Sequence, residues 1–179
     1  MRRRPVLMLI AAAALGPARA QGRAPAEVAG EWPAARLQGQ GRMRFLGLHV
    51  YDIRLWAGAV LLGKEDWARA PLALEIEYAR SLVGRQIAER SIAEMERSGP
   101  MAQDQIERWL AEMTQLFPDV KGGDRITGVH NPGAGARFYF NGRLRGEVRD
   151  AEFARRFFGI WLGSWTSEPS LRDALFGSR

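Results

Sequence analysis

The chain contains no cysteine and only two histidines, His49 and His130. Without cysteine the protein has no disulfide, no thiolate metal site and no cysteine nucleophile. The two histidines form no H-x-x-x-H or H-E-x-x-H motif, so a metal site is not expected. The chain also lacks a G-x-S-x-G elbow, and its G-x-G pairs at 39–41 and 133–135 lack the third glycine of a dinucleotide-binding loop. The sequence therefore predicts neither a metal nor a cofactor.

The chain has little excess of basic over acidic residues once the first twenty residues are set aside. Residues 2–4 are basic, residues 6–15 are apolar and residues 18–20 are small-x-small, which is the pattern of a secretory signal peptide cleaved after Ala20. The apolar stretch is shorter than the about 18 residues that a membrane span needs. Four of the 26 Lys and Arg lie in this segment, which holds no Asp or Glu, so 22 basic face 20 acidic residues in the remainder, a net charge of +2. We expect a periplasmic or secreted protein with no nucleic-acid partner and no transmembrane segment in its mature chain.

An exported protein without disulfides depends on its core for stability. The 159 residues that follow the predicted cleavage site suit one domain, which at this size buries roughly 70% of its unfolded surface. We expect residues 21–30 to be a short flexible N-terminus and residues 31–179 to form the domain.

Alternating apolar residues predict strands before and after the middle of the chain. Residues 31–59 are strand-like, but their apolar face switches between Val50 and Tyr51, which indicates a bulge or burial on both sides. Residues 72–79 alternate cleanly, and we expect Glu75 and Glu77 to face water.

The period returns to two after residue 124, and the Asn141-Gly142 pair is typical of a two-residue hairpin turn. Helical spacing predicts helices over 83–98, 106–117 and 150–162, followed by a short one over 171–176. The order of strands, two helices, strands and helices predicts an α+β domain with a mostly antiparallel sheet and helices packed on one face.

The helix predicted over 150–162 carries an unusual amount of aromatic surface. Asp150 is a typical N-cap residue, and we expect Gly163 to end the helix in a left-handed conformation. Phe153, Phe157, Ile160 and Trp161 form one stripe, which we interpret as core rather than as a pocket wall, with Gly159 permitting close approach.

Three polar residues of the strand-like stretch stand inside an apolar run: Tyr51, Asp52 and Arg54. Asp52 and Arg54 share a strand face, where they form either a surface ion pair or the polar mouth of a pocket. Arg80 follows the alternating strand and either holds a carboxylate in a bidentate pair or is solvated.

Several motifs together resemble the bacterial branch of the chalcone isomerase family. They are "HVYDIRLW" at 49–56, Gly123-Asp124, Pro132-Gly133-x-Gly135, Asn141-Gly142 and Ile160-Trp161-Leu162-Gly163. The resemblance covers residues 34–177. It implies an open-faced β-sandwich in which a long curved antiparallel sheet and its helices enclose an apolar cleft, with no cofactor. Plant members of the family cyclise chalcones, and related members of the fold are thought to bind fatty acids.

The resemblance does not extend to the catalytic residues of the plant enzymes. Their Arg, Thr and Tyr fall at Met43, Asp52 and Ile87 of this chain. A carboxylate in place of the Thr repels a phenolate substrate, so we do not expect chalcone isomerase activity.

Three hypotheses follow. The first is an exported binding protein that holds a small apolar or fatty-acid-like ligand in the cleft, with polar contacts from Arg44, Tyr51, Asp52 and Arg80. The second is an isomerase or lyase with Asp52 as general base and Tyr51 or an Arg stabilising an enolate, which requires a buried Asp52 with a raised pKa. The third is a structural or assembly partner in the envelope, with a collapsed cleft.

Overall fold

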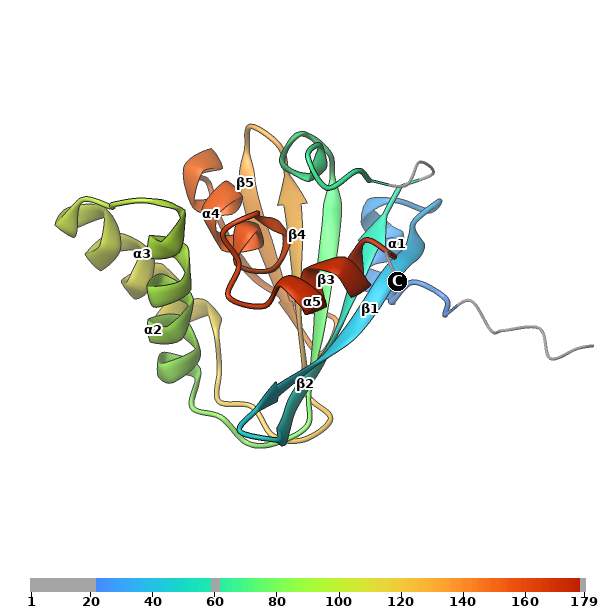
Figure 1. Cartoon of the computed structure of the whole chain (residues 1–179), viewed down its shortest axis with the longest axis horizontal. Coiled ribbons are helices and arrows are strands. Elements are labelled where there is room, and N and C mark those ends of the chain that lie inside the picture. The colour runs from blue at the N-terminus through green and yellow to red at the C-terminus, as the bar shows by residue number, and fades with distance from the viewer. Residues whose placement is uncertain (1–21, 59–61, 178–179) are drawn as a thin grey trace, which may run out of the picture.

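The computed structural model describes residues 22–58 and 62–177 (Figure 1), so the predicted signal peptide lies outside the described residues. The described chain forms a six-stranded antiparallel sheet in which each strand pairs with its neighbours in sequence. The strands are β1 (Arg36–Phe45), β2 (Leu48–Ala57), β3 (Leu72–Tyr78), β4 (Arg125–Asn131), β5 (Gly135–Phe140) and β6 (Arg143–Val148).

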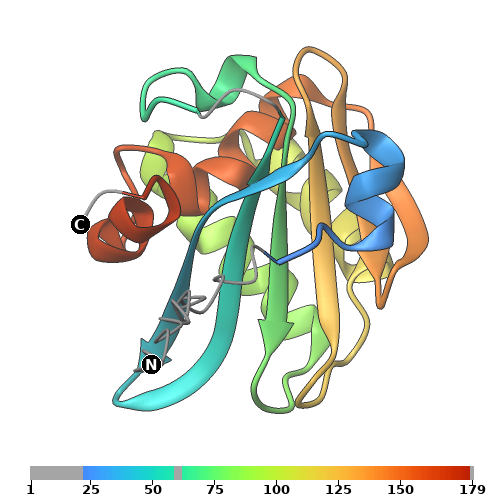
Figure 2. The same cartoon turned by 90° about the vertical axis from the view of Figure 1, so that its right-hand side faces the viewer.

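Helices cover mainly one face of this sheet. They are α1 (Ala26–Glu31), α2 (Gly84–Met95), α3 (Gln103–Leu116), α4 (Ala151–Leu162) and α5 (Pro169–Leu175), with short 3-10 turns η1 (Trp67–Arg69) and η2 (Glu96–Ser98). Figures 1 and 2 show α2, α3 and α4 on one side of the sheet and α1 on the other. The predicted α+β fold, with a curved antiparallel sheet and helices on one face, is confirmed, and α1 is an addition to it.

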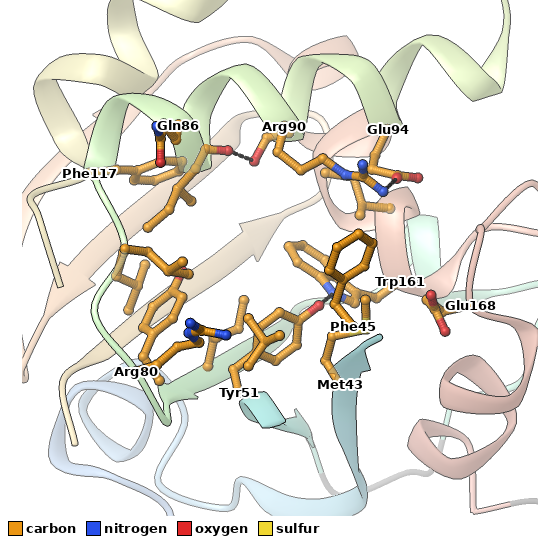
Figure 3. Close-up of a pocket in the computed structure, with 18 of the residues that line it drawn as sticks. Met43, Phe45, Tyr51, Arg80, Gln86, Arg90, Glu94, Phe117, Trp161 and Glu168 are labelled. Carbon is orange, nitrogen blue, oxygen red and sulfur yellow. Dashed lines mark hydrogen bonds and ion pairs between the residues drawn. The ribbon is translucent and has the colours of Figure 1, made fainter. Parts of the chain in front are cut away.

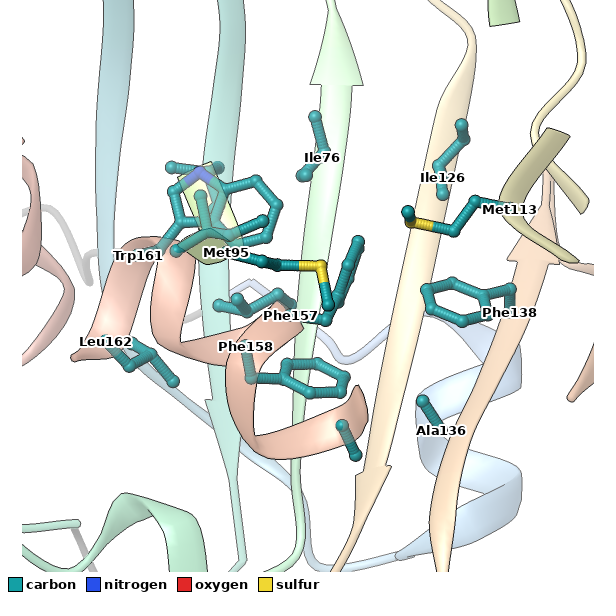
Figure 4. Close-up of a cluster of buried hydrophobic side chains, with 14 of the residues drawn as sticks. Ile76, Met95, Met113, Ile126, Ala136, Phe138, Phe157, Phe158, Trp161 and Leu162 are labelled. Atoms are coloured by element: carbon teal, nitrogen blue, oxygen red, sulfur yellow. The ribbon is translucent and has the colours of Figure 1, made fainter. Parts of the chain in front are cut away.

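The aromatic residues of α4 lie at the centre of the main core (Figure 4). Phe153 and Phe158 are fully buried, and Phe157 packs edge-to-face on Phe138 of β5 with ring centroids 5.1 Å apart. Such pairs contribute about 0.5–1.5 kcal/mol beyond the area that they bury. The predicted core stripe of α4 is therefore confirmed.

The two ends of α4 differ in how well the sequence predicted them. Asp150 caps the helix as expected, with one carboxylate oxygen accepting hydrogen bonds from the backbone N–H groups of Glu152 and Phe153. The prediction of a left-handed Gly163 was wrong, because its φ is −71° and its backbone is extended. A Cβ on Gly159 or Gly163 would collide with the ring of Trp165, so both glycines serve close packing, as expected for Gly159.

The strand-like stretch over 31–59 contains the hairpin of β1 and β2, and its change of face has a local cause. Met43 pairs with Tyr51 and Arg44 pairs with His49, so Val50 is an extra residue on β2. This bulge turns the side chains that follow it to the opposite face. The bulge predicted from the face switch is confirmed.

The face of the sheet opposite α4 is covered where the sequence predicted solvent. The prediction that Glu75 faces water was wrong, because Glu75 is only 3% exposed. Its carboxylate accepts hydrogen bonds from Trp56 Nε1 at 2.9 Å and from Arg125 at 3.2 Å. Helix α1 lies over this site and adds Glu27, which accepts a hydrogen bond from Arg125 at 3.1 Å. Part of the segment expected to be flexible, 21–30, thus forms a helix with buried residues.

Candidate ligand-binding site

An open pocket lies between the concave face of the sheet and helices α2 and α4 (Figure 3). Its volume is about 390 Å³. The strands β1 to β4 form its floor, α2 and α4 form two of its walls, and Phe117 after α3 closes one side. The side chains that give the pocket its apolar character are Met43, Ile76, Leu82, Ile87, Phe117, Ile126, Phe157, Ile160 and Trp161.

The aromatic helix is both core and pocket wall. Phe157, Ile160 and Trp161 are buried against the rest of the protein, and the same three side chains line the pocket. The sequence analysis treated these functions as alternatives, but the pocket opens at the edge of the core rather than apart from it.

Tyr51 and Trp161 are joined across the pocket floor. The indole Nε1 of Trp161 donates a hydrogen bond to the Tyr51 hydroxyl at 2.9 Å, shown as a dashed line in Figure 3. Burial raises the pKa of Tyr51 to about 12, because the phenolate would lose its hydration. Tyr51 therefore remains a neutral phenol at neutral pH, with its hydroxyl proton available to an acceptor.

Arg80 provides positive charge at one side of the pocket. It lies in the segment between β3 and α2, together with Ser81, and Gln86 of α2 lines the pocket nearby. Its side chain is exposed, and among residues 22–58 and 62–177 no carboxylate lies within ion-pair distance of it. A guanidinium without a protein partner at the edge of an apolar cavity is suited to binding a ligand carboxylate in a bidentate pair.

The other side of the pocket carries two glutamates, one of which is ion-paired. Figure 3 shows Glu94 and Glu168 across the cavity from Arg80. Glu94 is nine-tenths buried, and it accepts a hydrogen bond from Arg90 at 2.5 Å. Glu94 also lies 3.7 Å from Arg97, and Arg90 itself lines the pocket, so two arginines offset the negative charge of this side. Arg80 differs from Arg90 in having no carboxylate partner among the described residues.

The structure brings together two of the four predicted ligand contacts. Tyr51 and Arg80 line the pocket, whereas Arg44 and Asp52 do not. Arg44 donates a hydrogen bond to the carbonyl oxygen of Gly47 at 3.2 Å. Strand alternation is the cause: Arg44 lies between Met43 and Phe45, which line the pocket, and Asp52 directly follows Tyr51.

Asp52 has the wrong environment for a general base. Its carboxylate accepts a hydrogen bond from Arg42 at 2.8 Å and lies 3.2 Å from His49 Nε2. The hydrogen bond from Arg42 holds the pKa of Asp52 below its ordinary value, whereas the base hypothesis requires a raised pKa. The proposed surface pair with Arg54 is also absent, since Arg54 binds Glu75 and Glu77 instead.

Helix α2 supplies pocket residues that the sequence analysis did not single out as ligand contacts. Ile87, Ser91 and Glu94 recur at spacings of four and three residues on one face of α2. A serine and a glutamate inside an apolar helical stripe are the pattern that could have identified this wall. Met43 and Ile87, which stand where the plant enzymes carry their catalytic Arg and Tyr, line the pocket with apolar side chains.

Two further kinds of feature are missing from the part of the chain that the structure describes. Within 22–58 and 62–177, no group of three or more His, Cys, Asp or Glu is arranged to hold a metal ion. Over these residues, too, no helix has the length and apolar character needed to cross a membrane.

Comparisons with known proteins agree with this architecture. A model of the chalcone isomerase-like family matches residues 31–177. An uncharacterized protein of Haemophilus influenzae is 30% identical over 129 residues, which are 72% of this chain but only 61% of that protein. The crystal structure of a fatty-acid binding protein from Arabidopsis thaliana has a TM-score of 0.62 at 15% identity and covers 80% of this chain and 87% of its own. At that identity the likeness shows the fold alone.

Proposed function

This chain belongs to the chalcone isomerase-like family, and we propose that it is a binding protein that holds a medium-chain fatty acid or a similar apolar carboxylate in the pocket between its sheet and helices α2 and α4. The observation that carries this proposal is an open apolar cavity with a single guanidinium, that of Arg80, lacking a carboxylate partner in the described chain.

The size and lining of the pocket fit the apolar part of such a ligand. Its 390 Å³ lie near the lower end of the roughly 300–1,000 Å³ typical of small-molecule sites. Each methylene that leaves water for these walls contributes about 0.8 kcal/mol, so chain length sets most of the affinity. The small volume favours a medium-length chain over a long one.

The polar groups fit the head of the ligand. Arg80 donates to the carboxylate at the exposed side of the pocket, whereas Arg90 at the other side is already paired with Glu94. The fold of the fatty-acid binding protein from Arabidopsis thaliana supports the same class of ligand by analogy.

The other two hypotheses have less support. Asp52 lies outside the pocket with a lowered pKa, and the Tyr51 phenol, with a pKa of about 12, is not a base at neutral pH. Isomerase or lyase chemistry therefore loses the base that we assigned to it. An envelope partner without a small ligand was expected to have a collapsed cleft, whereas the pocket is open.

We further propose that residues 1–20 direct export, so that the protein works in the periplasm or outside the cell. The three-part pattern of this segment supports the proposal. Intact-mass measurement of protein from the periplasmic fraction should give a chain that begins at Gln21. A full-length chain that stays in the cytoplasm would argue against export.

Calorimetric titration with dodecanoate, below its micelle concentration, tests the binding proposal. We expect one-to-one saturation, weakened about fivefold in Arg80→Ala, because a partly exposed ion pair contributes about 1 kcal/mol. Dodecanol, which has no charge, should bind both proteins equally. Arg44→Ala is the matched control, since it removes the same charge outside the pocket. Absence of saturable binding, or an equal loss in Arg44→Ala, would refute the proposal.

A further inference from the structure

Three large apolar side chains are exposed together where β1 turns into β2. The exposed fractions are 58% for Phe45, 86% for Leu46 and 55% for Leu48. Phe45 and Leu48 are paired directly across the hairpin, and Leu46 occupies the turn between them. Single exposed leucines are common on protein surfaces, but a contiguous apolar group at the most projecting point of a hairpin indicates an interaction site. We call these three residues the hairpin tip.

The backbone of Leu46 makes this composition more unusual. Leu46 and Gly47 have φ values of 48° and 80°, and the turn between β5 and β6 has nearly the same values, 48° and 81°, at Asn141 and Gly142. Asn is favoured at such a position, whereas a leucine in the left-handed region is strained. Because Leu46 is exposed, packing within the chain does not offset this strain. The residue type and the backbone conformation therefore disagree at position 46, and such disagreements are expected mainly at functional positions.

The hairpin tip borders the ligand pocket. Phe45 lines the pocket with one part of its side chain although most of it is exposed (Figure 3). Figures 1 and 2 place the hairpin turn and the segment between β3 and α2, which carries Arg80, at the same end of the sheet. A surface that receives the tip therefore also faces the pocket.

Two arginines at this end of the sheet have no acidic partner in the part of the chain that the structure describes. Arg44 lies within the hairpin, and neither it nor Arg80 has a carboxylate within ion-pair distance among the described residues. Asp52, the acidic residue of the hairpin, is already bound to Arg42 and His49. Apolar side chains next to unpaired arginines match the surface of an anionic bilayer, which offers both acyl chains and phosphate groups.

We propose that the hairpin tip docks this protein on anionic phospholipid membranes, with Phe45, Leu46 and Leu48 entering the headgroup region. Docking in this orientation lets an apolar carboxylate pass between the bilayer and the pocket without crossing water. The transfer of ligand between bilayer and pocket depends on the proposed binding function. Membrane docking itself depends only on the hairpin tip and the arginines near it.

Co-sedimentation with vesicles tests the proposal, using protein without residues 1–20 so that their apolar stretch does not bind lipid itself. Vesicles of phosphatidylcholine and phosphatidylglycerol should bind the protein, and pure phosphatidylcholine should bind it less. Leu46→Asn should weaken vesicle binding roughly tenfold through the lost apolar burial. It should leave the dodecanoate affinity in solution unchanged, and its thermal unfolding should stay cooperative with no loss of stability, since Asn fits the turn.

Two matched variants separate the tip from general surface effects. Leu144→Thr removes a leucine on β6 that is 58% exposed, as Phe45 is, and should retain wild-type vesicle binding. Arg44→Gln should weaken binding to the anionic vesicles about fivefold. Failure of the wild-type protein to bind vesicles, or an equal loss in Leu144→Thr, would overturn docking. Self-association that Leu46→Asn abolishes, without vesicle binding, would assign the tip to a second copy of the chain and also overturn it. Dodecanoate titration in solution, without vesicles, tests the proposed binding function independently of docking.

Discussion

Replacing Phe157 by alanine should cost less stability than replacing its neighbour Phe158. Both rings are buried in the core, but Phe157 also lines the pocket, so part of its ring lacks contacts that a closed core provides. Removal of a buried Phe costs about 3–5 kcal/mol. We expect about 3 kcal/mol for Phe157→Ala and about 5 kcal/mol for Phe158→Ala. At about 2–4 °C per kcal/mol, the melting temperature falls by about 6–12 °C and about 10–20 °C.

The two variants should also differ in the ligand that they prefer. Phe157→Ala enlarges the pocket, and each further methylene that it buries contributes about 0.8 kcal/mol, or about fourfold in affinity. An acid longer by two methylenes should therefore gain about fifteenfold over its wild-type affinity, while Phe158→Ala should show no gain. Titration with fatty acids of increasing length measures the shift. The same shift in both variants, or none in Phe157→Ala, would refute the assignment of Phe157 to the pocket wall.

Three further changes test other parts of the structure. Glu75→Ala should lower the free energy of unfolding by about 2–3 kcal/mol in urea denaturation, because it strips the buried Trp56 indole of its acceptor; no loss would contradict the buried network. Burial acts to raise the pKa of Asp150, but the hydrogen bonds that its carboxylate accepts, first that from the Phe153 N–H, outweigh burial and lower the pKa below its ordinary value of 3.8. The stabilisation by the ionised carboxylate is therefore complete above 3.8 and is lost as the pH falls through the lower pKa of the folded state. Asp150→Asn should remove this contribution to the acid-induced loss of stability, and an unchanged acid profile would contradict it. Leu46→Asn should raise stability by about 1 kcal/mol by relieving left-handed strain, so a lower melting temperature would argue against that strain.

Local signals predicted the elements that local interactions determine. The Asp150 cap involves only the first turn of α4, and the bulge at Val50 appears directly as a change of apolar face along one strand. The aromatic stripe of α4 likewise identified a core helix without any knowledge of its partners. In each case the pattern that identifies the feature lies within one short stretch of the sequence.

Long-range contacts explain where the sequence analysis failed. Glu75 alternates with apolar neighbours as a solvent-facing residue does, but its partner Arg125 is 50 positions away and α1 covers both. Nothing in residues 21–30 shows that this short helix has a surface to cover. The turn at Leu46 was missed because leucine is not a turn residue, although its backbone is that of Asn141.

Among the candidate ligand contacts, Arg80 and Arg44 also could not be told apart from local sequence signals. Both are arginines near apolar strands, and their sequence neighbourhoods do not differ in kind. Arg44 faces away because it alternates on β1 with Met43 and Phe45, whereas the packing of α2 over the sheet places Arg80 beside the pocket. The ligand class that we propose was already suggested by the sequence, whereas the placement of Arg80 beside the cavity required the fold.

A crystal structure of the protein grown with dodecanoate tests the central claim most directly. The account predicts one acyl chain between Ile87 of α2 and Trp161 of α4, with its carboxylate within hydrogen-bond distance of Arg80. An empty pocket at saturating dodecanoate, or a ligand bound on the opposite face of the hairpin beside Asp52, would contradict it.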